Sequence, residues 1–176
     1  LTSSDTDSLS GTGANETFYA QNSPHWATSD TVLGGAGQDT LILRDGAEAF
    51  DTNTYNVSGI EHFEFTNGVN DGQNVIIRDA YFSSTGFDGN TLTFNSDQTI
   101  TLDASGLLAG NNLHFIGDDD GGSDDHDSVT SGAGDDTMVG WSGRDTLISG
   151  AGDDSIDGGD SNCLLYTSDA ADEVSC

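Results

Sequence analysis

Aspartate recurs at a fixed interval near the C-terminal end of this chain. Four consecutive nonapeptides fill Gly122–Asp157, and their sixth residues are all aspartates: Asp127, Asp136, Asp145 and Asp154. Their eighth residues are all apolar: Val129, Met138, Leu147 and Ile156. Glycine is frequent in the positions before each aspartate. Carboxylates on glycine-rich turns supply oxygen ligands, which hard cations such as Ca²⁺ prefer. The spacing therefore predicts metal binding rather than acid–base catalysis.

The elements that position these aspartates follow from the same period. Glycine reaches positive φ at little cost, so a glycine-rich turn can direct its carbonyl oxygens inward. The apolar eighth residue and its two neighbours form a very short strand with one inward side chain. Stacking of such units buries a continuous core that a single unit cannot bury. The period predicts an all-β fold, a parallel β-roll or β-solenoid with calcium-binding turns.

The nonapeptides GSDDHDSVT, SGAGDDTMV, GWSGRDTLI and SGAGDDSID resemble the RTX, or haemolysin-type, calcium-binding repeat G-G-x-G-x-D-x-U-x. A further copy is GGAGQDTLI (Gly34–Ile42), preceded by the degenerate HWATSDTVL (His25–Leu33). A weaker echo, GTGANETFY, places Glu16 at the acidic position. The resemblance implies that alternate repeats stack on one side and that successive loops share a metal ion.

Carried over to this chain, the resemblance implies that Asp127 and Asp145 face one side and that Asp136 and Asp154 face the other. Near the N-terminus, the resemblance implies that Asp30 faces one side and Asp39 the other. The expected Ca²⁺ ligands are Asp30, Gly34, Gly35, Gly37, Asp39, Asp127, Gly132, Gly134, Asp136, Gly143, Asp145, Gly150, Gly152 and Asp154. The alternative is a set of solvated acidic turns that hold no metal.

Some repeats depart from the family pattern. Trp141 replaces a glycine, Arg144 places a cation beside Asp145, and Asp125 stands where glycine is expected. We therefore expect weaker or empty sites on the first and third nonapeptides. The two SGAGDD loops, in which serine replaces only the first glycine, are the strongest candidates.

The section between the repeats has no clean nonapeptide. Its short apolar or alternating runs are IEHFEF, NVII, TLTF, TITL and LHFI, separated by Gly, Asn, Asp and Ser. Such runs predict strands. The simplest interpretation is irregular rungs of one continuous solenoid, and the alternative is a small β-sandwich inserted between two calcium rolls. This gives degenerate repeats at 1–42, an irregular β-section at 43–121 and a β-roll at 122–162.

Residues 163–176 form a separate tail. CLLYTSDAADE (Cys163–Glu173) resembles the translation of a common transposase-based sequencing adapter, which implies a non-native tail and a fragment of a longer protein. We expect this tail to be unpacked and the rung around Ile156 to fray. Both cysteines of the chain, Cys163 and Cys176, lie in the tail, so no disulfide is inferred.

Composition narrows the class of partner. The formal net charge is −28, with 31 acidic residues and three arginines as the only strong bases. Repulsion of this size opposes a compact state, and bound cations would relieve it. Nucleic acid and anionic lipid both require basic patches, so neither is an expected partner. The chain has no run of about 18 apolar residues that could span a membrane.

Catalytic signatures are missing from the sequence. His62 and His114 alternate with apolar residues and are predicted to be outward strand residues, and His126 lies in an acidic loop. We expect a non-catalytic, calcium-dependent folding and secretion module of a larger secreted or cell-surface protein. The resemblance also implies export by a type I secretion apparatus. Two alternatives are an accessory part of a secreted polysaccharide-acting enzyme, using Trp26, Trp141 and Arg78, and a repeat segment of a surface adhesin.

Overall fold

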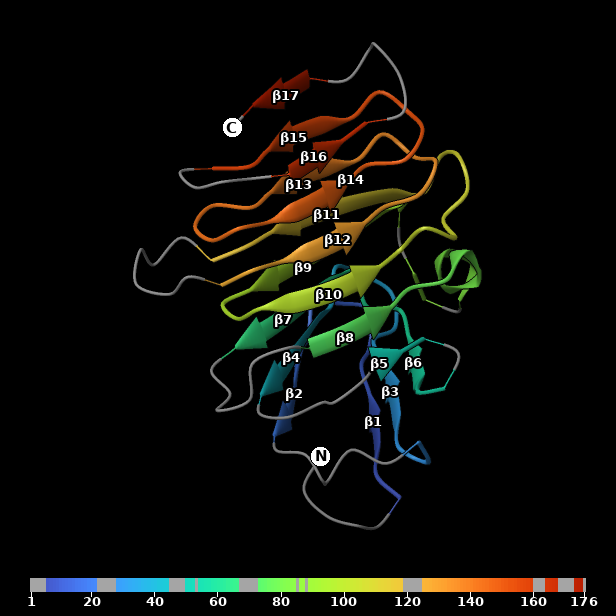
Figure 1. Ribbon diagram of the computed structural model, residues 1–176. Helices are drawn as coiled ribbons and strands as arrows, with labels where there is room; N and C mark the ends of the chain where they lie inside the picture. Colours follow the sequence, from blue (N-terminus) through green and yellow to red (C-terminus); the bar gives the residue numbers. More distant parts are fainter. Residues whose placement is uncertain are drawn as a thin grey trace.

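The computed structural model is a parallel β-solenoid (Figure 1). It describes residues 6–21, 28–44, 50–52, 54–66, 73–84, 86–87, 89–118, 125–159, 164–167 and 173–175. Every strand pairing within these residues is parallel. The predicted all-β solenoid is confirmed.

Three parallel sheets make up the walls of the solenoid. The eight-stranded sheet contains β2 (Thr17–Gln21), β4 (Thr40–Arg44), β7 (His62–Thr66), β9 (Thr91–Ser96), β11 (Asn112–Ile116), β13 (Thr137–Val139), β15 (Ser155–Asp157) and β17 (Glu173–Ser175). The six-stranded sheet contains β5 (Phe50–Asp51), β8 (Gln73–Ile76), β10 (Ile100–Asp103), β12 (Ser128–Thr130), β14 (Thr146–Ile148) and β16 (Leu164–Tyr166). The three-stranded sheet contains β1 (Ser8–Ser10), β3 (Thr31–Leu33) and β6 (Asn56–Ser58).

The apolar eighth residues of the repeats stack inside the solenoid. In the six-stranded sheet, Val129 lies opposite Leu147, and in the eight-stranded sheet, Met138 lies opposite Ile156. All four are at most 2% exposed. Each repeat strand has a single inward position because neighbouring side chains of a strand point to opposite faces.

The middle section continues the same solenoid. Strands β7, β9 and β11 pair in register, so that His62, Thr93 and His114 form one outward row. Strand β11 then pairs with β13 of the repeats, which joins the two regions. The interpretation as irregular rungs is confirmed, and no sandwich interrupts the described strands. The only helical segment among them is the short 3₁₀ helix η1 (Asp79–Ser83), and none of the described helices could cross a membrane.

The described part of the C-terminal tail corrects one expectation. Strand β16 pairs with β14, and β17 pairs with β15, so the tail adds two strands to the solenoid. Leu165 lies opposite Leu147 and packs partly against the core, while Leu164 remains 50% exposed. Ile156, where fraying is expected, is 2% exposed and pairs with Val174. The reason is that Leu165 and Val174 continue the nine-residue apolar spacing of the repeats.

Candidate metal centre

The repeat aspartates form a ladder between neighbouring rungs. Asp136 N donates to Asp154 Oδ1 at 2.8 Å, and Asp127 N donates to Asp145 Oδ1 at 2.9 Å. Asp127 and Asp145 directly precede β12 and β14 of the six-stranded sheet. Asp136 and Asp154 precede β13 and β15 of the eight-stranded sheet. The predicted division of these aspartates between two sides is therefore confirmed.

The N-terminal acids repeat this arrangement. Asp30 Oδ1 accepts from Asp7 N at 3.0 Å, and Asp39 Oδ1 accepts from Glu16 N at 2.7 Å. Asp30 and Asp39 again precede strands of two different sheets. Both are fully buried. An aspartate in a turn thus fixes the backbone of the rung before it, both near the N-terminus and in the C-terminal repeats.

Glu61 belongs to the same ladder, although the sequence analysis did not identify it. Its Oε2 accepts from Asp39 N at 2.8 Å, and the residue is 3% exposed. No glycine-rich nonapeptide surrounds Glu61, so its sequence context carries no repeat signal. Only the pairing of β4 with β7 places this carboxylate above Asp39.

In Asp39 and Asp145, the second carboxylate oxygen is buried against the first residue of the same nonapeptide. A Cβ on Gly34 would lie 2.5 Å from Asp39 Oδ2, and a Cβ on Gly140 would lie 2.5 Å from Asp145 Oδ2. Neither oxygen accepts a hydrogen bond from the residues that the structure describes. A buried oxygen without a partner is costly, more so when it is charged. Coordination of a cation would satisfy it.

Serine at the first repeat position changes this contact. Ser131 Oγ donates to Asp136 Oδ2 at 2.5 Å, in the place where other repeats have a glycine. Ser149, the equivalent residue one turn later, is also fully buried. Serine at this position therefore gives one oxygen of Asp136 a donor, whereas Ser149 Oγ makes no hydrogen bond within the described residues.

The glycine carbonyls of one loop lie directly against the next loop. Gly150 and Gly152 have φ values of 86° and 139°. A Cβ on Gly150 would lie 1.9 Å from Gly132 O, and a Cβ on Gly152 would lie 2.1 Å from Gly134 O. Only glycine permits both the left-handed backbone and this close approach. The SGAGDD loops consequently place carbonyl and carboxylate oxygens close together between two rungs.

Two other loop pairs share this arrangement. A Cβ on Gly35 would lie 2.2 Å from Thr12 O, and a Cβ on Gly37 would lie 2.8 Å from Ala14 O. A Cβ on Gly143 would lie 1.5 Å from Asp125 O. The predicted glycine ligands thus occupy equivalent positions in the N-terminal and C-terminal repeats.

Trp141 follows the backbone path of the glycine that it replaces. Its φ of 61° makes it the one non-glycine residue with positive φ among the described residues. A Cβ on Gly159 would lie 2.1 Å from Trp141 O, as Gly150 lies against Gly132 O. Left-handed backbone costs a non-glycine residue roughly 1–2 kcal/mol. The Trp141 loop keeps the turn geometry at this cost.

Arg144 lies against a histidine of the preceding loop. The Arg144 backbone N donates to His126 Nδ1 at 2.9 Å, and its guanidinium Nη2 lies 3.2 Å from His126 Nε2. His126 itself is exposed. These contacts connect the first and third nonapeptides along their outer surface.

Burial makes the charged form of the aspartates unfavourable. It raises the pKa of Asp127 to about 7 and the pKa of Asp136 to about 6, and the negative charges of Asp145 and Asp154 add to the respective shifts. Burial also raises the pKa of Asp39 and of Asp145. A bound cation reverses this effect because it stabilises the carboxylate.

The donor set fits a hard cation that accepts backbone oxygen. No group of three or more His, Cys, Asp or Glu side chains converges within the described ranges. A metal between two loops would therefore take carbonyl oxygens together with one or two carboxylates, all oxygen, which suits Ca²⁺. Tetrahedral zinc sites use Cys and His instead.

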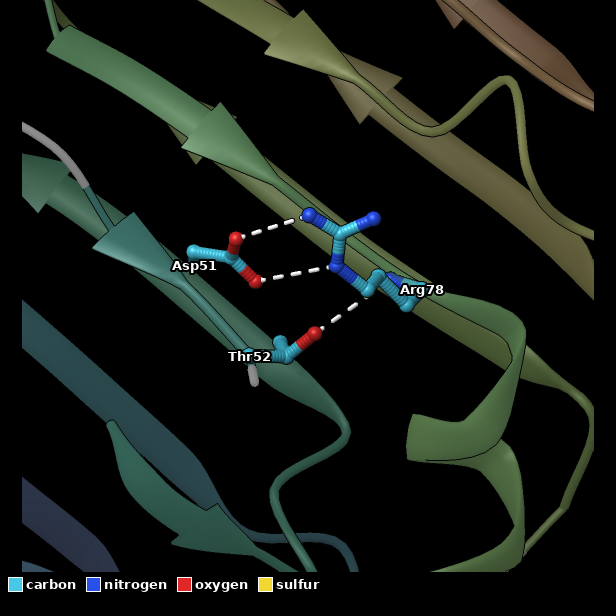
Figure 2. A network of polar contacts seen from close by, with 3 residues as sticks. All are labelled: Asp51, Thr52 and Arg78. Carbon is cyan, nitrogen blue, oxygen red and sulfur yellow. Dashed lines mark hydrogen bonds and ion pairs between the residues drawn. The ribbon is translucent and has the colours of Figure 1, made fainter. Parts of the chain in front are cut away.

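The residues considered for carbohydrate chemistry are not gathered in one place. Arg78 Nη2 lies 2.9 Å from Asp51 Oδ2, and Arg78 N donates to Thr52 Oγ1 at 3.3 Å (Figure 2). This ion pair lies on the surface and joins β5 to the segment after β8, which is a structural role. Trp141 lies in a distant loop, 42% exposed, and Trp26 lies outside the described residues.

His62 and His114 lie at outward positions of two strands of the eight-stranded sheet. His62 and His114 alternate with buried residues of β7 and β11, as the sequence predicts. Burial lowers the pKa of the half-buried His62. The neutral imidazole is the favoured form at this position.

Comparison with known families supports the assignment of the turns. The family described as RTX calcium-binding nonapeptide repeat (4 copies) matches residues 27–53, 122–147 and 142–168. No curated protein and no solved structure gives a significant match. The matched segments contain Asp30, Asp39 and the four aspartates of the C-terminal repeats, while Glu16 and Glu61 lie outside them. Residues 27–53 and 122–168 therefore carry RTX calcium-binding nonapeptide repeats, and the described residues form a parallel β-solenoid.

Proposed function

We propose that this chain binds Ca²⁺ between successive turn loops and that ion binding drives the folding of its repeat rungs. The observation that carries the proposal is the pair of SGAGDD loops, residues 131–136 and 149–154. There, buried carboxylates and backbone carbonyls of neighbouring rungs lie together without a basic side chain in either loop. The role is binding and folding rather than catalysis.

Asp136, Asp154 and the carbonyl groups of Gly132 and Gly134 are the residues that would hold the ion in this loop pair. Bound Ca²⁺ supplies positive charge and accepts six to eight oxygen ligands. The protein supplies the spacing, because Asp154 also holds the backbone N–H of Asp136. The same carboxylate thus holds the backbone of the preceding rung.

Folding and ion binding are coupled through charge. With a formal charge of −28, the chain repels itself when the carboxylates are ionised. A ligand that binds only the folded state stabilises it by RT ln(1 + [L]/Kd). Extracellular calcium modules commonly have Kd values of about 10⁻⁴–10⁻³ M. Several stacked sites of this kind favour the folded solenoid in millimolar calcium and the unfolded repeats in low calcium.

This behaviour suits a module of a secreted or cell-surface protein. A chain that stays unfolded in low calcium can pass through a type I secretion apparatus and fold where calcium is abundant. Arg78, the basic residue of the polysaccharide-acting alternative, forms a surface ion pair with Asp51.

A calcium titration of the full chain, followed by far-UV circular dichroism, tests the proposal. We expect a cooperative gain of β-structure in Ca²⁺ but not in equimolar Mg²⁺. Asp154→Asn should raise the calcium midpoint about tenfold or more, because it removes a ligand charge. Asp153→Asn is the matched control, since Asp153 is the exposed neighbour of the buried Asp154 and its replacement should leave the midpoint nearly unchanged. Equal spectra in chelator and in calcium, with no shift for either variant, would reject calcium-coupled folding.

A further inference from the structure

The ladder of acids is interrupted in the middle of the solenoid. In the eight-stranded sheet, the strand pairing aligns, from rung to rung, Glu16, Asp39, Glu61, Leu92, Leu113, Asp136 and Asp154. In the six-stranded sheet, Ile100 occupies the position below Asp127 and Asp145. Three central positions that correspond to ligand aspartates therefore carry aliphatic side chains.

These aliphatic residues belong to a thicker core. Leu92, Leu113 and Ile100 are at most 1% exposed. Strands β9 and β11 each place a second residue inward, Phe94 and Phe115, whereas each of the repeat strands β12 to β15 places only one. Buried apolar area is the main driving force of folding, so these rungs carry more of it per strand.

Aromatic rings extend this core across several rungs. Phe63 and Phe94 stack with centroids 5.1 Å apart, and Phe50 lies 5.4 Å from Phe63. Tyr81 of η1 contacts Phe63 at 6.0 Å. Each of these rings is at most 4% exposed. These ring-to-ring contacts connect β5, β7, β9 and η1 and involve no metal ligand.

The turns of these rungs are filled by side chains. Tyr81 Oη donates to Ile60 O at 3.0 Å and accepts from Ile60 N at 3.2 Å. The side chains of Ile60, Ala104 and Leu107 are at most 2% exposed. In the repeats, the corresponding turns contain glycine carbonyls and carboxylates. In these central turns, buried side chains fill the interior, and Tyr81 pairs with the backbone of Ile60.

We propose that strands β7 to β11 form a core that stays folded without calcium and that separates two calcium-dependent arrays, one at each end. The C-terminal array attaches to this core through its first acids, because Asp127 Oδ1 accepts from Ile100 N at 2.9 Å and Asp136 Oδ1 accepts from Leu113 N at 2.6 Å. The persistence of the core does not depend on metal binding. The calcium dependence of the two ends rests on the function proposed above.

Hydrogen–deuterium exchange of the full chain, measured by mass spectrometry in chelator and in calcium, tests this division. In chelator at pH 8, strands β7, β9, β10 and β11 should be protected, while β12 to β15 should exchange at the rate of an unfolded chain. Calcium should then protect β12 to β15, and Mg²⁺ should not.

Alanine substitutions at two matched leucines distinguish the stability of the core from that of the C-terminal array. Leu102 and Leu147 are both at most 1% exposed and lie in one inward row of the six-stranded sheet, with Val129 between them. Leu102→Ala should reduce protection of β7 to β11 in chelator at least tenfold. Leu147→Ala should leave that protection unchanged and raise the calcium concentration that protects β12 to β15.

Each outcome has a distinct meaning. Absence of protection in chelator, followed by simultaneous protection of all strands in calcium, overturns the calcium-independent core and leaves calcium-coupled folding intact. If the core strands are protected in chelator but the repeat strands gain no protection in calcium, the calcium-independent core is supported and the proposed function is contradicted. Equal protection of the core and the repeats in chelator overturns the division into core and arrays.

Discussion

At the residue scale, each repeat aspartate has two functions. One oxygen accepts a backbone N–H from the rung before it, as Asp145 does from Asp127. The other oxygen is buried against the first residue of its own repeat. In the folded rung, these two contacts fix the orientation of the carboxylate.

The raised pKa values of Asp127 and Asp136 predict opposite pH dependences with and without calcium. Their folded values of about 7 and about 6 lie above the value of about 3.9 for an unfolded aspartate. In chelator, protonation therefore stabilises the folded repeats; this contribution is complete below about pH 4 and is lost as the pH rises through 6 to 7. In limiting calcium, protons compete with the ion, so acidification should raise the calcium midpoint.

Exchange protection of β12 to β15 in chelator between pH 5 and 8, corrected for intrinsic exchange rates, measures the first effect. The calcium midpoint at the same pH values measures the second. The double variant Asp127→Asn, Asp136→Asn should flatten the dependence in chelator, which separates these two groups from the general relief of charge repulsion. A folded repeat region that gains stability as the pH rises in chelator would contradict the prediction.

At the element scale, the loop is the unit that transmits contact from rung to rung. Its glycines are required because carbonyl oxygens of the neighbouring loop occupy the space of a side chain. Trp141 shows that the backbone path can persist without glycine when the side chain points outward. The central rungs use a different solution, in which Tyr81 and Leu107 fill the turn.

Gly152→Ala should weaken calcium-coupled folding strongly. Its φ of 139° is unfavourable for alanine, and the new Cβ would lie 2.1 Å from Gly134 O. We expect the calcium midpoint in the circular dichroism titration to rise at least tenfold, which corresponds to about 1.4 kcal/mol. Gly106→Ala is the control, because no atom lies within 4 Å of a Cβ at that position. Similar midpoints for the two variants would show that close packing of the loops is not required.

At the scale of the whole molecule, the solenoid is a stack whose ends need cover. Terminal repeats of solenoids require a cap because their last core face would otherwise meet water. Here β16 and β17 follow the last repeat, with Leu164 N donating to Asp145 O at 2.8 Å and Glu173 N donating to Asp154 O at 2.8 Å. The tail therefore adds a rung beyond the last repeat.

Substitutions at two adjacent leucines test the contribution of this rung. Leu165→Asp places a charge in the inward row opposite Leu147, so protection of β14 in calcium should fall severalfold in hydrogen exchange. Leu164→Asp is the control, because Leu164 is 50% exposed on the outer side. An equal effect of both substitutions, or of neither, would mean that the tail does not pack as a rung in solution.

Some features of the fold followed from the sequence because their signals are local. A nine-residue period places one inward side chain and one carboxylate in each repeat, which predicts the solenoid. The resemblance to RTX repeats implied the sides of Asp127, Asp136, Asp145 and Asp154. The same spacing continues through Leu165 and Val174, but the resemblance of the tail to an adapter led to the wrong expectation of an unpacked tail.

The repeat pattern by itself determined the β-roll, the oxygen-rich turns and the candidate ligands. The reason is that the glycines, the aspartate and the apolar residue that form them lie within a single nonapeptide. Only the tertiary structure decided the alignment of the irregular middle rungs, where loops of unequal length hide the period. That alignment placed Glu61 above Asp39 and put Leu92 and Leu113 in the column of acids. The physical reason is that register between distant segments depends on pairing and packing in space.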